Sequence, residues 1–160
     1  MYIEGFDYIK KHFNECRPQP DYKSFLTIHK MKDGTPFAII CKKYEIEAVC
    51  FKNGRIQRLC VGLFSIKKDA DGYKYLHLVF IKSNEAKRGV GRQVINVLKD
   101  HGIKNNCKYI WLLSVQSAEE FYEKTGFKRS DRIRKISHFS FDLDKISKIP
   151  ITKINRRVEV

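Results

Sequence analysis

The sequence predicts one α/β (α+β) domain built on a mixed central sheet. Three observations carry this prediction: four strand-like runs follow one another from Pro36 onward, a run with helical spacing follows Gly91, and a short apolar run occupies 107–115. The first runs are joined by tight-turn sequences, which predicts an antiparallel meander. The later strand–helix–strand succession predicts a crossover with parallel pairing.

An amphipathic helix is expected at 3–16. Its apolar residues recur at steps of three and four: Phe6, Ile9, Phe13 and Cys16. Pro18 and Pro20 end this helix. Residues 22–30 fit a short helix or an irregular link equally well.

The meander is predicted from runs rich in Val, Ile, Phe and Tyr, which read FAIICKK, EIEAVCFK, RIQRLCVGLFSIKK and YKYLHLVFIKS. Between them, KNGR at 52–55 and DADG at 69–72 supply the glycine or asparagine that tight turns need.

The second half alternates helix and strand. A helical period runs from Gly91 to about Gly102, and CKYIWLLSV at 107–115 is typical of a buried strand. The segment SAEEFYEKTGF predicts a short helix with Ser117 as its N-cap and Gly126 as its stop. A last strand is expected at 135–143, where apolar and polar residues alternate.

The composition indicates which classes of partner the protein would attract. The chain has 160 residues, of which 42% are hydrophobic, and its formal net charge of +14 favours polyanionic partners and disfavours a polycationic substrate. The five cysteines are scattered and form no CxxC pair, so we expect reduced thiols and no metal site. With no long apolar run and no signal-like start, we expect no membrane partner and a cytoplasmic location.

The turn before the second predicted helix, NEAKRGVGRQ, combines two glycines with basic residues. Gly89 and Gly91 allow exposed backbone N–H groups next to a helix N-terminus, and Lys87, Arg88 and Arg92 add positive charge. Such a turn suits a pyrophosphate group, although a cationic turn without a ligand fits this stretch equally well. The pattern is neither GxGxxG nor a Walker loop.

Two stretches together resemble the GNAT superfamily of acetyl-CoA-dependent N-acetyltransferases. VFIKSNEAKRGVGRQVINVL is similar to its [QR]-x-x-G-x-[GA] motif, and SAEEFYEKTGF is similar to its later N-x-x-A-x-x-F-Y-x-x-x-G-F motif, in the same order and spacing. The match spans 73–127 and leans slightly toward the histone-acetyltransferase branch. Two positions depart from the family: Ala86 replaces Gln or Arg, and Val115 replaces the asparagine.

The resemblance implies a binding site for acetyl-CoA as co-substrate. By analogy, the backbone at the end of the strand 73–82 holds the pantetheine arm, the Gly-rich turn holds the pyrophosphate, and the later helix completes the site. The implied cofactor-binding residues are Phe80, Ile81, Lys82, Lys87, Arg88, Gly89, Val90, Gly91, Arg92, Ser117, Ala118, Phe121 and Lys124.

The resemblance also implies catalytic roles. Tyr122 matches the family tyrosine that protonates the departing thiolate. Ser114, Gln116 and Ser117 are candidate substitutes for the missing asparagine, and Ser114 is taken as the catalytic candidate. The strand before the turn has no carboxylate, so His77 is the candidate general base. Glu45, Glu47 and an ordered-water route remain alternatives.

The implied function is N-acetylation of a primary amine, with a protein lysine or N-terminus expected ahead of an aminoacyl-tRNA or a small amine. A nucleic-acid-binding module and an acyl-CoA sensor on the same fold remain alternatives. We expect an acetyltransferase domain at 1–144 and a basic tail at 145–160, which fits either an edge strand or a partly flexible segment. Monomer and homodimer stay equally open, and the basic stretches KRSDRIRK and INRRVEV favour a protein or RNA-associated acceptor.

Overall fold

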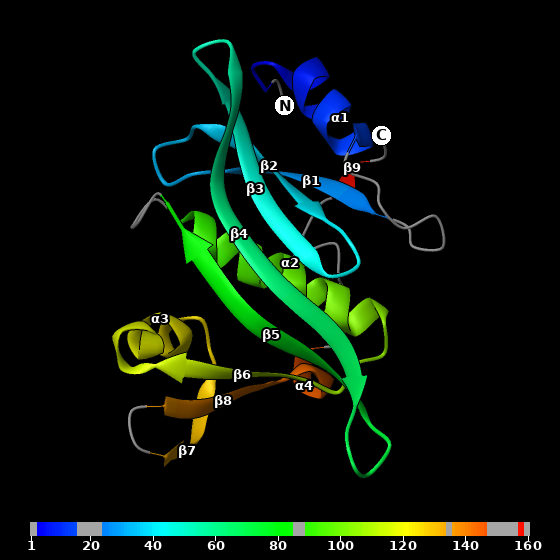
Figure 1. Cartoon of the computed structure of the whole chain (residues 1–160), viewed down its shortest axis with the longest axis vertical. Helices are drawn as coiled ribbons and strands as arrows, with labels where there is room; N and C mark the ends of the chain where they lie inside the picture. The colour runs from blue at the N-terminus through cyan, green and yellow to red at the C-terminus, as the bar shows by residue number, and fades with distance from the viewer. Residues whose placement is uncertain (1–2, 16–23, 85–88, 134–135, 147–156, 159–160) are drawn as a thin grey trace.

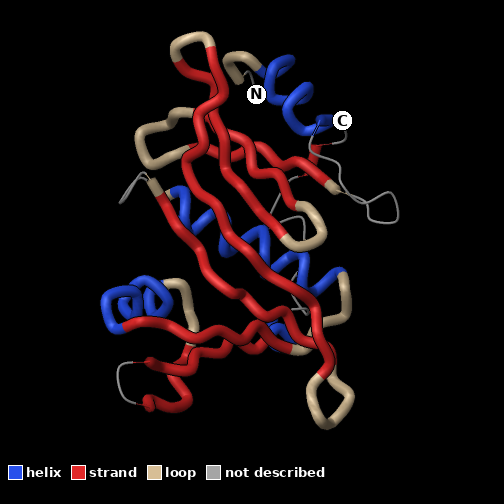
Figure 2. The backbone as a smooth tube through the Cα atoms, viewed as in Figure 1, coloured by secondary structure: helices blue, strands red, loops and turns tan. Residues whose placement is uncertain are grey.

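The computed structural model describes residues 3–15, 24–84, 89–133, 136–146 and 157–158. Their backbone forms one nine-stranded mixed sheet in the order β7-β8-β6-β5-β4-β3-β2-β1-β9 (Figures 1 and 2). The elements in chain order are α1 (Phe6–Glu15), β1 (Phe25–Lys30), β2 (Pro36–Cys41), β3 (Glu45–Lys52), β4 (Arg55–Lys68), β5 (Lys74–Ser83), α2 (Val90–Lys104), β6 (Tyr109–Val115), the 3₁₀ turn η1 (Gln116–Ala118), α3 (Glu119–Lys124), β7 (Lys128–Ile133), β8 (Ile136–Asp142), α4 (Leu143–Ile146) and β9 (Arg157–Val158).

The predicted topology is confirmed. Strands β1 to β5 pair antiparallel in sequence order, and β5 pairs parallel with β6 after the α2 crossover. The undecided segment at 22–30 contains β1, because Phe25 and Leu26 are buried in the sheet. Strand β7 was not predicted, since KRSDRI lacks an apolar alternation and forms its strand by pairing with β8.

The helix around Phe121 begins later than its sequence suggests. Ser117 lies in η1, and α3 starts after Ala118 with no side-chain hydrogen bond at its cap, so the prediction of Ser117 as N-cap is wrong. At this end of α3 the short 3₁₀ turn η1 precedes the helix in place of a side-chain cap. Gly126 follows the helix with φ +95, as expected of a stop signal.

The sheet carries two cores, one on each face. Helix α2 buries Val94, Ile95 and Leu98 in the larger core, together with Tyr122 of α3 and Leu143 of α4. The smaller core lies under α1. In Figure 1, β4 and β5 pass in front of α2, so the view looks onto the face of the sheet that α2 does not cover.

A buried carboxylate ties α1 to the sheet. The Glu47 side chain of β3 is fully buried, with His12 Nε2 of α1 at 2.5 Å from its Oε1 and an Arg58 guanidinium nitrogen at 2.9 Å from its Oε2. The guanidinium is not aligned for a hydrogen bond with Oε2, so this contact is an ion pair. Because a buried carboxylate needs compensating charge, removing one of its partners should destabilise the fold.

We predict that Arg58→Ala lowers the free energy of unfolding by about 1 to 3 kcal/mol, since it leaves Glu47 under-compensated while Arg58 itself is half exposed. Urea unfolding followed by Trp111 fluorescence measures the change. Adding Glu47→Gln should restore part of the loss. Arg55→Ala, at an exposed position on the same hairpin, is the control, and an equal loss in both arginine variants would contradict the role of the pair.

Candidate active site

Strands β5 and β6 separate near the middle of the sheet. Their parallel pairing runs from Tyr75 with Tyr109 to Leu78 with Leu112 and ends there. Beyond that point β5 stays paired with β4 as far as Ser83, while β6 stays paired with β8. The two strands diverge in Figure 1. Residues 79–83 and 113–115 therefore lie on either side of a separation, called here the β5–β6 opening, where the two strands are not paired with each other.

A bulge marks the same place. Leu63 of β4 faces Phe80 and Phe64 faces Leu78, so Val79 is the extra residue of β5. Val79 is 52% exposed and Phe80 41% exposed. The register shift bends β5 away from β6 and lets the rest of β5 follow β4. Phe80, Ile81 and Lys82, three of the predicted cofactor residues, all lie past this bulge.

Helix α2 begins close to the end of β5. Its N-cap is Gly89, at φ +85 in the left-handed region, and no side chain among the described residues caps its first turn. The backbone N–H groups at the start of α2 are therefore available to an anion. Val90 is buried and Arg92 is exposed. The predicted contacts Lys87 and Arg88, with Ala86, lie outside the described residues.

Gly91 brings the two sequence motifs together. A Cβ atom at this position would lie 3.2 Å from Cε1 of Phe121, so the missing side chain makes room for the α3 aromatic ring against α2. Ser117 is exposed and Ala118 half-buried in η1. Lys124 is exposed at the end of α3, where it pairs with Glu120 at 2.9 Å.

One cationic side chain near α2 was missed by sequence reasoning. Lys32 lies in the β1–β2 turn, and its Cγ would be 3.3 Å from a Cβ atom on Gly89. The turn is held there by buried Met31 and by His29, whose side chain hydrogen-bonds Gln93 in the first turn of α2. Lys32 is 57 residues from Gly89 in the sequence, so no local motif indicates this neighbourhood.

Tyr122 is fixed in the larger core. It is 5% exposed and contacts the rings of Phe121, Phe127 and Phe139. Burial, reinforced by the nearby Cys60 thiol, raises the pKa of Tyr122 to about 12. Its hydroxyl therefore stays protonated at any physiological pH and can donate a hydrogen bond or a proton.

Polar side chains at and beside the end of β6 are engaged in hydrogen bonds. Ser114 is buried, and its hydroxyl donates to the Val115 carbonyl at 2.9 Å. Next to it, the Ser137 hydroxyl donates to the buried Glu119 carboxylate at the start of α3, and Arg129 lies 3.9 Å from the other Glu119 oxygen. The contacts of Glu119 hold α3 against β7 and β8.

His77 lies on the sheet face opposite α2. Its ring contacts Trp111 at 5.0 Å between centroids, and its buried Nδ1 has no hydrogen-bond partner. Burial, and then the charge of Lys67, lower the pKa of His77 below its usual value. The neutral imidazole, which can accept a proton, is therefore favoured at neutral pH.

Glu47 and Glu45, the two carboxylates that are alternatives to His77 as general base, do not lie on β5. Glu47 is occupied under α1 by His12 and Arg58, and Glu45 lies 3.7 Å from Lys42 in the β2–β3 turn. By register Glu45 faces Leu63, which in turn faces Phe80, so two strand spacings separate Glu45 from β5. His77, on β5 itself, lies nearer to the bulge in the register.

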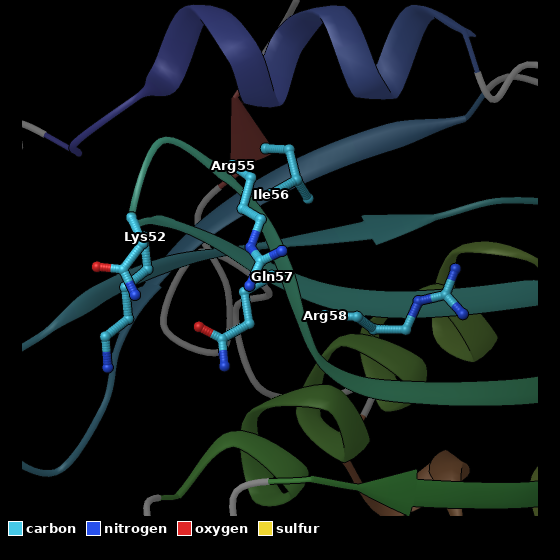
Figure 3. A pocket seen from close by; sticks show the side chains of 6 residues that line it. Lys52, Arg55, Ile56, Gln57 and Arg58 are labelled. Atoms are coloured by element: carbon cyan, nitrogen blue, oxygen red, sulfur yellow. The ribbon is translucent and has the colours of Figure 1, made fainter.

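A basic hollow lies at the tip of the β3–β4 hairpin (Figure 3). It has a volume of about 430 Å³ and is lined by Lys52, Asn53, Arg55, Ile56, Gln57 and Arg58. In Figure 3 the Arg58 side chain points away from those of Lys52 and Gln57. None of the predicted cofactor residues that the structure describes lines this hollow.

Among the described residues, no group of three or more His, Cys, Asp or Glu side chains is arranged to hold a metal ion. No helix in the same part of the chain has the length and apolar character needed to cross a membrane. Four cysteines, Cys41, Cys50, Cys60 and Cys107, are buried and free of disulfides.

Comparison with known proteins identifies the fold. A sequence model of the acetyltransferase (GNAT) family matches residues 6–127. No curated protein sequence gives a significant match. Among solved structures, the GNAT domain of S. lividans PAT has a TM-score of 0.57 at 6% identity, over 73% of this chain and 96% of that chain.

Two further structures share the fold. A bacterial toxin has a TM-score of 0.53 at 12% identity, covering 64% of this chain and 69% of its own. The NatC complex bound to Gag peptide and CoA has a TM-score of 0.50 at 16% identity, covering 60% of this chain and 67% of its own. At these identities the similarity concerns the fold.

Proposed function

The chain belongs to the acetyltransferase (GNAT) family, and we propose that it acts as an N-acetyltransferase that moves the acetyl group of acetyl-CoA to a primary amine. The observation that carries the proposal is the β5–β6 opening, bordered by unpaired strand edges and followed by the start of α2, which no side chain of the described residues caps. This arrangement offers hydrogen bonds to an extended amide-containing arm and N–H groups to a pyrophosphate.

The chain's own residues fit acetyl-CoA in two segments. The β5 backbone at Phe80, Ile81 and Lys82 would bond the pantetheine amides. The α2 start, from Gly89 to Arg92, would hold the pyrophosphate. Ser117, Ala118, Phe121 and Lys124 would border the cofactor on the α3 side, and Lys87 and Arg88 remain proposed phosphate contacts on the strength of the sequence. We take residues 1–144 as the catalytic domain.

The reaction needs three protein contributions. A base removes a proton from the ammonium group, and the neutral amine then attacks the thioester carbonyl carbon. A C–N bond forms, the C–S bond breaks, the attacking nitrogen loses a second proton, and the leaving sulfur gains one, so that this step balances. We assign His77 as the base, Tyr122 as the proton donor to sulfur, and Ser114 as the polar group replacing the family asparagine. Incubation with labelled acetyl-CoA and a small primary amine tests the overall activity directly.

Tyr122→Phe should lower kcat by about a hundredfold or more, because the ring is retained and only the proton donor is lost. The dissociation constant for acetyl-CoA should stay within about threefold of the wild-type value, since phenyl fills the same volume. Release of free CoA thiol measures kcat, and a thermal shift with acetyl-CoA measures binding. A variant that retains wild-type kcat would remove Tyr122 from the mechanism.

The pH profile tests His77. Because the pKa of His77 is lowered, its base form is already available below pH 6.5, and because the pKa of Tyr122 is about 12, no loss of activity is expected on the alkaline side below about pH 10. We expect His77→Ala to lower kcat/KM by more than about tenfold between about pH 6 and pH 9. A smaller loss would transfer the base role to a water route.

Lys32 is proposed as an additional phosphate contact. Lys32→Ala should raise the dissociation constant for CoA by about three- to tenfold, because one charge-assisted contact is lost at a partly solvated site. Binding of pantetheine, which lacks the phosphates, should not change. The same assay on Lys87→Ala and Arg88→Ala tests the other proposed phosphate contacts. Lys11→Ala, at an exposed position on α1, is the charge-matched control. An equal effect on CoA and pantetheine would contradict a phosphate contact.

A further inference from the structure

An open surface of aromatic side chains lies on the sheet face opposite α2. The register places Tyr75 and His77 of β5 next to Tyr109 and Trp111 of β6, and His138 of β8 faces Leu113 across the next pair of strands. These five rings, called here the aromatic face, are all half-buried and so present part of their surface to solvent. None of them belongs to the two motifs that gave the family.

The rings form two connected rows. Tyr75 and Tyr109 stack with centroids 5.1 Å apart and planes within 3° of parallel. His77 lies 5.0 Å from Trp111, which in turn lies 5.6 Å from His138. Because each row crosses from strand to strand, the rings make a broad surface suited to planar groups rather than a single pocket.

The described helices leave this surface uncovered. Helix α1 packs on the same side of the sheet but over its other end, with β3 and β4, while α2, α3 and α4 contribute to the core on the opposite side. Figure 1 looks onto the uncovered strands. Large apolar side chains continue the surface past the rings: Leu113 is 44% exposed, Val115 59% and Ile136 46%.

Charge decides between possible occupants. Lys67 on β4 faces Tyr75, and Lys128 on β7 faces Ser140 next to the rings. Carboxylates border the rings as well: Asp142 on β8 faces Tyr109, and the Tyr109 hydroxyl donates to Asp69 at 3.0 Å. The positive charge that bears on the occupant is therefore that of the whole chain, +14. A second copy or a cationic peptide would be repelled by this net charge, whereas a polyanion would be attracted.

A protein that binds single-stranded nucleic acid needs a surface on which bases can stack and a positive charge that attracts the phosphates. Bases stack on exposed aromatic rings of a sheet face, and Lys side chains contact the phosphates. The rows also lead to the β5–β6 opening, because the parallel pairs that carry them end at Leu78 and Leu112. A nucleic-acid segment lying on the rings would therefore end or pass beside the β5–β6 opening, where we propose that acetyl-CoA binds.

We propose that the aromatic face binds a single-stranded segment of nucleic acid that carries the acceptor amine to the β5–β6 opening. This assignment of the acceptor rests on the proposed function. The amine nitrogen of the nucleic-acid-linked group forms the new C–N bond to the acetyl carbon, the C–S bond breaks, and the proton lost from nitrogen is balanced by the proton gained by the CoA sulfur.

Binding is tested without acetyl-CoA. The probe is a fluorescent oligouridylate of about 12 nucleotides, titrated by anisotropy from about 50 to about 300 mM salt. Tyr75→Leu and His138→Leu should each weaken binding by at least about fivefold, and Tyr75→Phe should retain it because the ring remains. Lys67→Ala and Lys128→Ala should each reduce the log–log salt slope by about 0.7. Lys104→Ala, on α2 behind the sheet, is the control.

Transfer is tested with the same oligonucleotide bearing a 3′-aminohexyl group, compared with free aminohexanol. The expected ratio of kcat/KM for the linked amine over the free amine is at least about ten, and it should approach one in Tyr75→Leu and His138→Leu and at high salt. Thermal unfolding confirms that the variants are folded. The ratio refers each variant to its own free-amine turnover.

Several results would overturn the proposal: oligonucleotide binding equal in all variants, a kcat/KM ratio near one in the wild type, a peptide N-terminus acetylated better than the linked amine, or a dimer in sedimentation that Tyr75→Leu dissociates. If neither amine is acetylated, the proposed function fails together with the acceptor assignment. The anisotropy titration then still decides whether the aromatic face binds nucleic acid.

Discussion

The end of the parallel pairing between β5 and β6 is the constraint on which the rest of the site depends. At Leu78 and Leu112 the ladder stops, because the bulge at Val79 turns β5 toward β4 while β6 continues along β8. A fully paired sheet would leave no strand edge for a ligand in its centre. The separation exposes backbone donors and acceptors without exposing a sheet margin.

The surrounding elements keep this opening fixed. Helix α2 begins beside it and is anchored by its buried face, and Gly91 lets Phe121 pack close enough to join α3 to α2. On the other side, Ser137 and Arg129 hold Glu119 at the start of α3. Tyr122 is consequently held in a rigid, largely apolar setting, which is also why its pKa is raised.

Much of this arrangement was readable from the sequence, and the reasons are local. Alternating apolar runs and tight turns predicted the meander, and the two motifs predicted the family. Three features could not be predicted, because they depend on strand register and long-range packing, which no short sequence pattern encodes. They are the proximity of Lys32 to Gly89, the pairing of Glu47 with Arg58, and the joining of five rings into one surface. Strand β7 was missed because its partner, rather than its composition, makes it a strand.

Hydrogen exchange with and without acetyl-CoA shows whether the cofactor binds at the β5–β6 opening. Acetyl-CoA should slow amide exchange at residues 79–83 of β5 and at the first turn of α2, from Val90 to Arg92, while the outer strands β1 and β2 change little. Protection confined to the basic hollow at the β3–β4 hairpin, or no protection at saturating acetyl-CoA, would contradict binding at the β5–β6 opening.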